Sequence, residues 1–254
     1  MRVAMMQPAF MPWQGFFELI CQADKFIFLD DFQFSVRSYH QRNRLFVNRG
    51  QIDWYTIPVR TSISSRDLLN CTAIAEDVPW KKKVLKRIQY NYRSALYYKD
   101  LFPLLEKCLS TRYESLAAQN IALILLACCK MQIDCDFYYS SQYPTDSKRS
   151  WRILELLQWL KADCYLCARG SFGYMLEDGV FPVDDVEVLF QNFMPSPYKQ
   201  IGAIGDFVPY LSAYDALFNI GPDSTLQLLK TGTKQWLTWN EMKASSLLKQ
   251  NNAL

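Results

Sequence analysis

Residues 6–34 read MQPAFMPWQGFFELICQADKFIFLDDFQF, and the fold follows from how this stretch divides. A short apolar strand at residues 3–6 ends at Pro8, because proline disfavours helical backbone at the residue before it. Pro12 suits the first turn of a helix, where a missing N–H has no partner to lose. Residues 25–29, KFIFL, are too apolar for a strand with one face in water, which indicates a strand buried on both faces. Together these segments predict one βαβ unit.

Four polar residues stand where the two strands of this unit end. Gln7 follows the first strand, and Asp30, Asp31 and Gln33 follow the second. Ligands of open α/β sheets bind beyond the carboxyl ends of the strands. The candidate ligand site is therefore expected at this edge.

The rest of the chain continues the alternation of strands and helices around two excursions. Residues 45–59 predict a β-hairpin with a bulge, because two β-rich runs flank a glycine-containing turn. An edge strand is expected at residues 68–75, followed by a helical insertion at about residues 79–131. The later elements are expected as helices at 99–109, 116–131, 148–161 and 213–219, and as strands at 136–140, 164–168 and 186–190. We therefore predict an α/β fold with a mostly parallel, Rossmann-like sheet, in one domain over residues 1–240 with a tail at 241–254.

Composition restricts the class of protein. Half of the 254 residues (50%) are hydrophobic, which is enough to bury a large core. The formal net charge of +3 is small for this length, so nucleic acid is not expected as a partner. No apolar run approaches the ~18 residues of a membrane span, and the N-terminus lacks a secretory signal pattern. We expect no membrane insertion and a cytoplasmic location. The composition indicates neither a cofactor nor an oligomeric state.

Most of the eight cysteines stand in apolar patterns and are expected to be reduced core thiols. These are Cys21, Cys108, Cys128, Cys129, Cys135, Cys164 and Cys167. Cys164-x-x-Cys167 has the spacing of redox and zinc sites, but residues i and i+3 of a strand point to opposite faces. With one histidine and no second cysteine pair, a zinc site would lack ligands, so no metal site is predicted.

The candidate site joins the strand-end residues to the run Arg42-Asn43-Arg44. A pair of acids such as Asp30 and Asp31 can bind Mg²⁺, act as a general base or hold a ligand hydroxyl. Two arginines can hold a phosphate or a carboxylate through paired hydrogen bonds. The alternative is that the acids only end a strand and the arginines form surface ion pairs.

Three further features each have a functional and a structural interpretation. His40, the only histidine, is either a proton carrier beside the arginine run or a solvated loop residue. Residues 169–173, RGSFG, follow a strand and offer backbone N–H groups to an anion, although such loops are common. Residues 145–147, TDS, are expected to cap the next helix rather than to bind an anion.

These motifs resemble those of one known family. The N-terminal pattern is QPxFxPWxGFFxLI at residues 7–20, ADxF at 23–26 and DDxQF at 30–34. The match continues at RNR (42–44), IP (57–58), WK (80–81), Tyr92, YKQ (198–200), FVP (207–209), LS (211–212) and DxLFN (215–219). The pattern is similar to that of the bacterial WbqC-like family and extends over about residues 1–235.

The resemblance implies a role in the biosynthesis of surface polysaccharide or O-antigen, where glycine transfer has been suggested for some members. The expected function is a transferase that moves a small acyl or aminoacyl group, such as glycyl, to a sugar or sugar-nucleotide. Asp31 or His40 would take the proton from the acceptor. The residues expected to bind the small-molecule substrate are Gln7, Trp13, Asp30, Gln33, Arg42, Asn43, Arg44 and Tyr92. Of these, Trp13 and Tyr92 would form a stacking wall.

A fainter resemblance is to the nucleotidyltransferase superfamily that contains pantothenate synthetase. A first strand that runs into a glycine-bearing helix start is common to both, but Pro12-Trp13-x-Gly15 stands here in place of the paired-histidine motif of that superfamily. One alternative function is therefore a degenerate nucleotide-binding enzyme of that topology. A second alternative is a non-catalytic binding protein of the polysaccharide machinery, with which an aromatic content of 15% is compatible.

Overall fold

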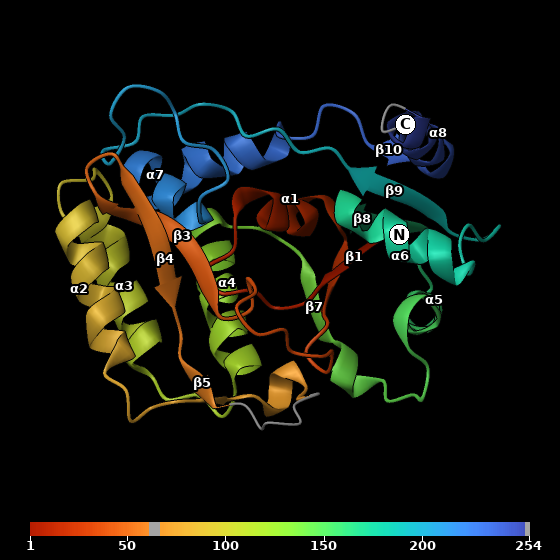
Figure 1. Cartoon of the computed structure of the whole chain (residues 1–254), viewed down its shortest axis with the longest axis horizontal. Coiled ribbons are helices and arrows are strands. Elements are labelled where there is room, and N and C mark those ends of the chain that lie inside the picture. Colours follow the sequence, from red (N-terminus) through yellow and green to blue (C-terminus); the bar gives the residue numbers. More distant parts are fainter. Residues whose placement is uncertain (61–66, 252–254) are drawn as a thin grey trace.

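The computed structural model describes residues 1–60 and 67–251, and this part of the chain forms an α/β fold (Figure 1). Its main sheet has six strands in the order β10-β9-β8-β1-β2-β7. The strands are β1 (Arg2–Met6), β2 (Lys25–Phe28), β7 (Asp136–Tyr139), β8 (Cys164–Ala168), β9 (Glu187–Gln191) and β10 (Leu237–Thr238). All pair in parallel except β10, which is antiparallel to β9. The predicted mostly parallel, Rossmann-like sheet is confirmed.

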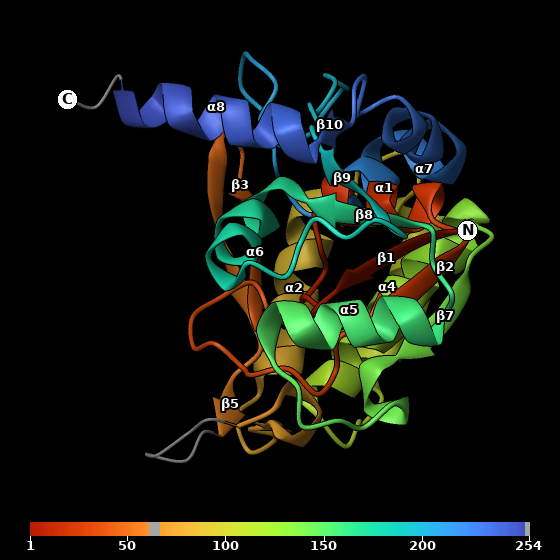
Figure 2. The ribbon, with the colours of Figure 1, turned by 90° about the vertical axis from the view of Figure 1, so that its right-hand side faces the viewer.

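The direction in which strands are added reverses at β1. The chain steps from β1 to β2 and β7 on one side, and then returns to place β8 and β9 on the other side. The first crossover helix, α1 (Gln14–Gln22), covers one face of the sheet. The helices α5 (Arg149–Trp159) and α6 (Phe172–Asp178) cover the other face and lie nearest the viewer in Figure 2. Sheets wound in this way bind ligands at the reversal, here between β1 and β8.

Alternate residues of the central strands enter two separate cores. Ala4 and Phe26 pack with α1 and the helical insertion, whereas Met5 and Ile27 pack with α5 and α6. All four side chains are at most 2% exposed. Two-sided burial explains why residues 26–29 have no polar position, and the prediction of a strand buried on both faces is confirmed after Lys25.

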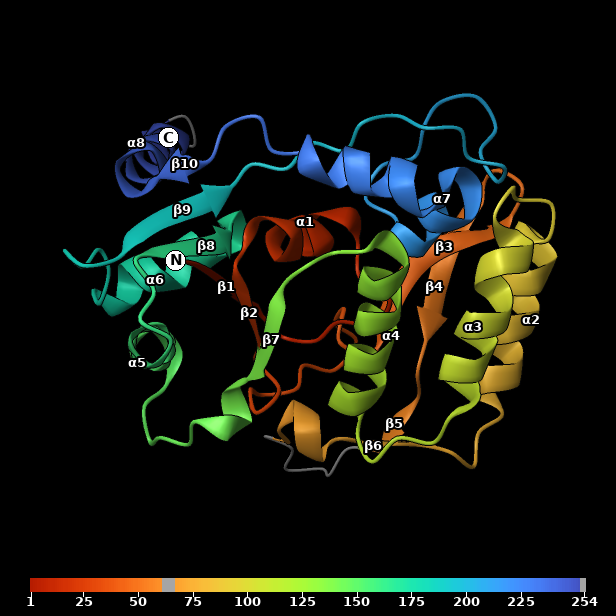
Figure 3. The same ribbon diagram turned by 180° about the vertical axis from the view of Figure 1, so that it is seen from behind.

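Both predicted excursions are present. The strands β3 (Arg42–Asn48) and β4 (Gln51–Thr56) form the hairpin, with the bulge between Phe46 and Asn48. The helices α2 (Trp80–Tyr92), α3 (Tyr98–Ser110) and α4 (Leu116–Met131) form the insertion and lie beside the hairpin (Figure 3). The edge strand predicted at residues 68–75 is much shorter. A 3₁₀ turn, η1 (Leu69–Cys71), precedes the two-residue β6 (Ala73–Ile74), which pairs with β5 (Val59–Arg60).

Two helix ends differ from the predictions. The N-cap residue of α5 is Lys148, whereas one of residues 145–147 was predicted. The side chains of Thr145 and Ser147 are used elsewhere: Thr145 accepts the N–H of Ser147, and Ser147 donates its hydroxyl hydrogen to Glu155. The helix α7 (Ala213–Lys230) continues far beyond residue 219. Gly221, with a φ of 79°, produces a kink after which the helix resumes.

The C-terminal segment is helical, and not all of the cysteines lie in the core. Residues predicted as a tail belong to the helix α8 (Trp239–Asn251), and the division into one domain and a tail stays a prediction. Cys164 and Cys167 enter different cores, as predicted from strand geometry, whereas Cys129 is exposed and is not a core thiol. None of the helices described has the length and apolar character to cross a membrane.

Two buried carboxylates tie distant segments to the helices. Asp215 on α7 accepts hydrogen bonds from the hydroxyls of Tyr92 and Tyr198, each at 2.7 Å. Glu18 on α1 accepts bonds from the N–H and the hydroxyl of Thr233, each at 2.6 Å. Burial raises the pKa of both carboxyls, and the hydrogen bonds partly offset that effect.

The buried side-chain amide of Asn120 connects the helical insertion to the edge of the sheet at which the strands β1 and β2 end, which we call the ligand edge. Asn120 on α4 is 0% exposed and donates to the carbonyl oxygens of Pro8 at 3.0 Å and His40 at 2.7 Å. Pro8 lies in the loop after β1, and His40 lies in the loop after β2. The insertion therefore determines where both loops run.

Replacing Asn120 with leucine is expected to lower the free energy of unfolding by about 2–4 kcal/mol. The leucine keeps the volume but leaves two buried carbonyl groups without donors. Urea unfolding of the purified protein measures the change. The control Cys129→Ala, at an exposed position of the same helix, is expected to change stability little. Equal stability of Asn120→Leu and wild type would contradict the proposed fastening.

Candidate functional site

A cavity of about 420 Å³ lies at the reversal of the sheet. Residues that follow β1 and residues that follow β8 form opposite walls. The polar side chains among its lining residues are Gln7, Tyr39, His40, Arg149, Ser171 and Tyr174. Its apolar wall includes Met5, Leu29, Phe32, Ile153 and Tyr165. Among the residues that the structure describes, no aspartate or glutamate lines this cavity.

His40 and Gln7 form a hydrogen-bonded relay that ends in the cavity. The backbone N–H of Ser35 donates to Nδ1 of His40 at 3.2 Å. Because a backbone N–H can only donate, Nδ1 accepts and Nε2 carries the proton. Nε2 then donates to Oε1 of Gln7 at 3.1 Å. The amide nitrogen of Gln7 consequently faces the opposite way, with one long bond of 3.4 Å to the carbonyl oxygen of Gln33.

The imidazole of His40 is held in its neutral form. The side chain is buried, at 8% exposed, and lies beside the ring of Phe34. Burial lowers the pKa of His40 to about 4. The alternative of a solvated loop histidine is wrong, because the side chain is buried. The bond to Gln7 favours a positioning role for His40, and its assignment as a proton carrier stays a prediction.

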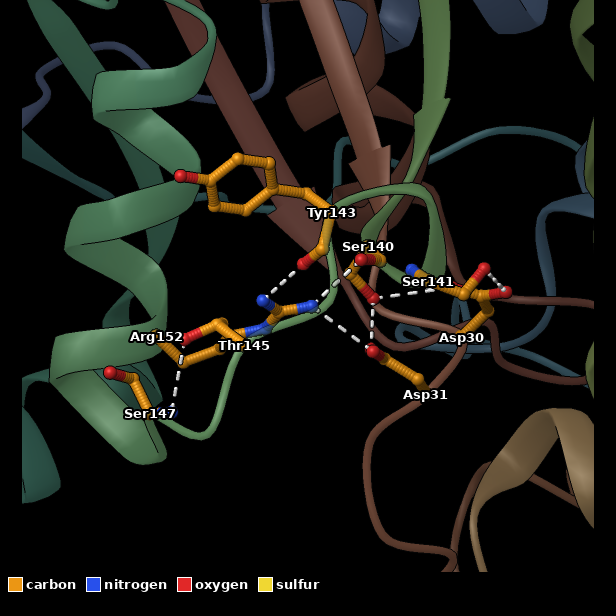
Figure 4. A network of polar contacts seen from close by, with 8 residues as sticks. All are labelled: Asp30, Asp31, Ser140, Ser141, Tyr143, Thr145, Ser147 and Arg152. Carbon is orange, nitrogen blue, oxygen red and sulfur yellow. Dashed lines mark hydrogen bonds and ion pairs between the residues drawn. The ribbon is translucent and has the colours of Figure 1, made fainter.

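Asp30 is bonded to the residues that follow β7 (Figure 4). Its Oδ1 accepts the N–H of Ser141 at 3.0 Å and the hydroxyl of Ser140 at 3.2 Å. Its Oδ2 accepts the hydroxyl of Ser141 at 2.7 Å. Asp30 thus joins the ends of β2 and β7.

Asp31 forms a half-buried ion pair in the same network. Its Oδ2 lies 3.1 Å from the guanidinium of Arg152 on α5, and its Oδ1 accepts the hydroxyl of Ser140. Arg152 is only 5% exposed and also donates to the carbonyl oxygens of Ser140 and Tyr143. These contacts favour a positioning role, and the assignment of Asp31 as general base stays a prediction.

The sequence pattern did not single out Ser140, Ser141 or Arg152. Arg152 stands on the apolar face of its helix, four residues before the buried Leu156. A charge on an apolar face is the signal that could have indicated a buried ion pair. Nothing in the sequence indicates which carboxylate would be its partner.

The arginine run divides into one structural residue and two unpaired ones. Asn43 is buried and donates to the carbonyl oxygens of Phe10 at 3.2 Å and Met11 at 2.9 Å, so it shapes the loop before α1. The guanidinium of Arg42 lies 4.2 Å from the ring of Trp54. Arg44 makes one long bond of 3.5 Å to the carbonyl oxygen of Tyr210.

The structure does not bring Trp13 and Tyr92 together as one wall. Tyr92 is fully buried in the insertion, where it bonds Asp215 and stacks on Phe218. Trp13 lies at the start of α1, with its ring against Phe193 and Tyr210. Neither side chain lines the cavity.

The remaining predicted positions lie at the rim. Gln33 has an exposed side chain and contributes only its carbonyl oxygen to the relay. Residues 169–173 form a 3₁₀ turn and the first residues of α6 rather than an open loop. Arg149 at the rim is paired with Glu177 at 3.2 Å and Asp178 at 2.9 Å. In the described ranges, no group of three or more His, Cys, Asp or Glu side chains is arranged to hold a metal ion.

The fold and the cavity define a Rossmann-like α/β protein with a pocket at the reversal of its sheet. The sequence profile of the WbqC-like protein family matches residues 7–227, so the chain belongs to that family. It is similar to the "Uncharacterized protein Rv1507c" of Mycobacterium tuberculosis, with 27% identity over 225 residues, which are 88% of this chain and 95% of that protein. No solved structure matches the chain significantly.

The buried state of His40 is expected to make stability depend on pH. The unfolded chain takes up a proton near pH 6.5 and the folded chain only near pH 4, so unfolding binds a proton between these values. The contribution of His40 to the free energy of unfolding should therefore fall by on the order of 3 kcal/mol as the pH falls through this window. Glu18 and Asp215, whose pKa values are raised, contribute in the opposite direction, so the difference between wild type and His40→Gln isolates the effect of His40. Urea unfolding at each pH measures the free energy of unfolding of both proteins. The variant His40→Gln should lack this loss, and an equal slope in both proteins would contradict the assignment.

Replacing Arg152 with methionine is expected to destabilise the protein by about 3 kcal/mol. The change removes a nearly buried charge, leaves the half-buried Asp31 without its counter-charge and leaves the carbonyl oxygen of Tyr143 without a donor. Chemical denaturation measures the loss. The matched control is Arg60→Met, since Arg60 pairs with Asp77 at the exposed surface and should contribute little. Similar small effects of both substitutions would rule out the network as a stabilising feature.

Proposed function

We propose that this protein transfers a small acyl or aminoacyl group, such as glycyl, to a sugar or sugar-nucleotide in surface polysaccharide biosynthesis. The reaction is assigned to the cavity between β1 and β8. Membership of the WbqC-like family and the position of the cavity at the reversal of the sheet support this proposal.

The observation that carries the proposal is the orientation of Gln7. The relay from Ser35 through His40 commits Oε1 of Gln7 to accepting a hydrogen bond, so its amide nitrogen is the group available to a ligand. A fixed N–H donor is suited to the carbonyl oxygen of an acyl group, on which negative charge develops when an acceptor attacks. The lack of a lining carboxylate among the described residues fits the same kind of ligand.

The size and apolar wall of the cavity fit a small ligand. Its volume of about 420 Å³ lies within the usual range for small-molecule pockets. Leu29, Ile153 and Tyr165 provide apolar surface opposite the polar groups. In this proposal His40 is a positioning residue and Gln7 contacts the substrate.

The nucleotidyltransferase alternative is less compatible with the start of α1. A Cβ atom on Gly15 would lie 2.2 Å from the ring of Trp13, which means that this ring rests directly on the glycine. A nucleotide approaching the first turn of α1 would have to displace it. Neither Trp13 nor a residue of α1 lines the cavity.

The role of Gln7 is tested with a thermal-shift screen of sugar-nucleotides, acyl-CoA, amino acids and ATP with Mg²⁺. A ligand at about 100 times its Kd adds roughly 2.7 kcal/mol of stability. We expect stabilisation by an acyl or aminoacyl compound, and at least about a tenfold loss of its affinity in Gln7→Met. Gln33→Met is the control, because that exposed side chain is outside the relay. Stabilisation by ATP with Mg²⁺ alone would favour the nucleotide-binding alternative. If no compound of the panel stabilises the protein, the alternative of a non-catalytic binding protein is favoured.

Asp31 as general base is tested separately. A base contributes roughly 10²–10⁴ in rate, so Asp31→Asn should lower turnover by that factor if Asp31 takes the acceptor proton. Circular dichroism verifies that the variant is folded. Near-normal turnover would leave Asp31 with the positioning role that its bonds to Arg152 and Ser140 favour.

A further inference from the structure

The outer face of the hairpin carries two arginines on one strand. Arg42 and Arg44 are two residues apart on β3, so their side chains leave the same face. Trp54 on β4 is directly opposite Arg44 and shares that face. Asn43, between the arginines, points to the other face and is buried. We call Arg42, Arg44 and Trp54 the arginine face.

Neither guanidinium of the arginine face has a counter-charge. Within residues 1–60 and 67–251, no carboxylate lies within ion-pair distance of Arg42 or Arg44. The Nε atoms of both arginines are buried and have no hydrogen-bond partner. Arg87, which contacts the same hairpin, is by contrast paired with Asp53 at 2.9 Å. Like charges that are partly buried and unpaired raise the energy of the folded chain.

An oxyanion would complete this arrangement. A guanidinium presents five donors in a plane, and two of them match two oxygens of a phosphoryl group. The Arg42 guanidinium lies over the ring of Trp54, and none of its N–H groups donates a hydrogen bond to a residue that the structure describes. Phosphoryl groups carry more acceptor oxygens and more charge than a single carboxylate, so two adjacent guanidinium groups suit them better.

The arginine face adjoins the cavity. Tyr39 lines the cavity, and its ring lies 5.6 Å from the ring of Trp54. Trp54 in turn carries the guanidinium of Arg42 at 4.2 Å. The cavity wall and the arginine face are therefore in direct contact through Tyr39 and Trp54.

We propose that the arginine face binds the phosphate or diphosphate of a phosphorylated substrate whose remaining part occupies the cavity. This inference rests on the proposed function, in which the acceptor is a sugar or a sugar-nucleotide, and it selects the phosphorylated members of that class. The substrate enters along the hairpin, with its phosphoryl group on Arg42 and Arg44 and its sugar near Gln7.

Pyrophosphate and inorganic phosphate are the probes that test the arginine face alone. Isothermal titration of the full chain is expected to detect pyrophosphate binding, and Arg42→Gln with Arg44→Gln should weaken it by at least about tenfold. The controls are Arg49→Gln, at the exposed turn of the same hairpin, and Lys82→Gln, on the lysine-rich surface of α2. Malonate, which carries two carboxylates and no phosphoryl group, shows whether negative charge alone is sufficient for binding. The inference is overturned if pyrophosphate does not bind, if the controls weaken binding equally, or if malonate binds as well.

Thermal unfolding without ligand keeps the test independent of folding defects. Because the two charges are unpaired, the double glutamine variant should unfold at the same temperature as wild type or at a higher one. Unfolding at a clearly lower temperature would show that the arginines are structural and would overturn the inference.

A third measurement separates this inference from the proposed function. Gln7→Met should leave pyrophosphate binding unchanged, while a sugar-nucleotide should lose affinity in both the Gln7 and the arginine variants. If a cavity ligand depends on Gln7 but not on the arginines, only the inference fails. If pyrophosphate depends on the arginines and no acyl compound or sugar-nucleotide depends on Gln7, only the proposed function fails. Phosphate and pyrophosphate, compared directly, distinguish a monoester from a diphosphate substrate.

Discussion

Two hydrogen bonds from the buried amide of Asn120 set the geometry on which the ligand edge depends. The loops after β1 and β2 are covered by the insertion, so their carbonyl groups lose contact with water and need donors within the protein. Asn120 provides them for Pro8 and His40 together. A loop fixed in this way keeps His40 buried and neutral, and a neutral His40 holds Gln7 in one orientation. The insertion is thus part of the frame of the site.

The polar residues at this edge divide by how many of their hydrogen-bonding groups are already used. Asp31 pairs with Arg152, and both Asp30 and Asp31 accept bonds from the serines after β7, which suits these three residues to holding β2, β7 and α5 in position. Gln7 keeps N–H groups that the protein does not fully use. Side chains of the first kind determine shape, and side chains of the second kind remain available for recognition.

Local patterns of the sequence were sufficient for the fold and for the edge at which the cavity lies. The mostly apolar run at residues 25–29 predicted a strand buried on both faces, and the β2 strand is buried in that way after Lys25. The partners of the polar residues were not predictable, because they come from distant parts of the chain. Asp31 and Arg152 are 121 residues apart, and Tyr92 meets Asp215 across 123 residues. Residue type alone made Tyr92 look available to a ligand, whereas it is fully buried and bonded to Asp215, and residue type did not indicate that Asp31 pairs with Arg152.

The ring of Trp13 on Gly15 has a consequence for electrostatics. The first turn of a helix carries partial positive charge, and in many Rossmann-like proteins that turn binds the phosphate of a ligand. Here an indole ring covers the glycine that would admit a phosphate close to the backbone. The ring of Trp13 therefore keeps an anion from approaching the partial positive charge at the start of α1 closely. An anion beside this helix start has to be held by other groups, and where these are side-chain charges a single substitution can remove the attraction.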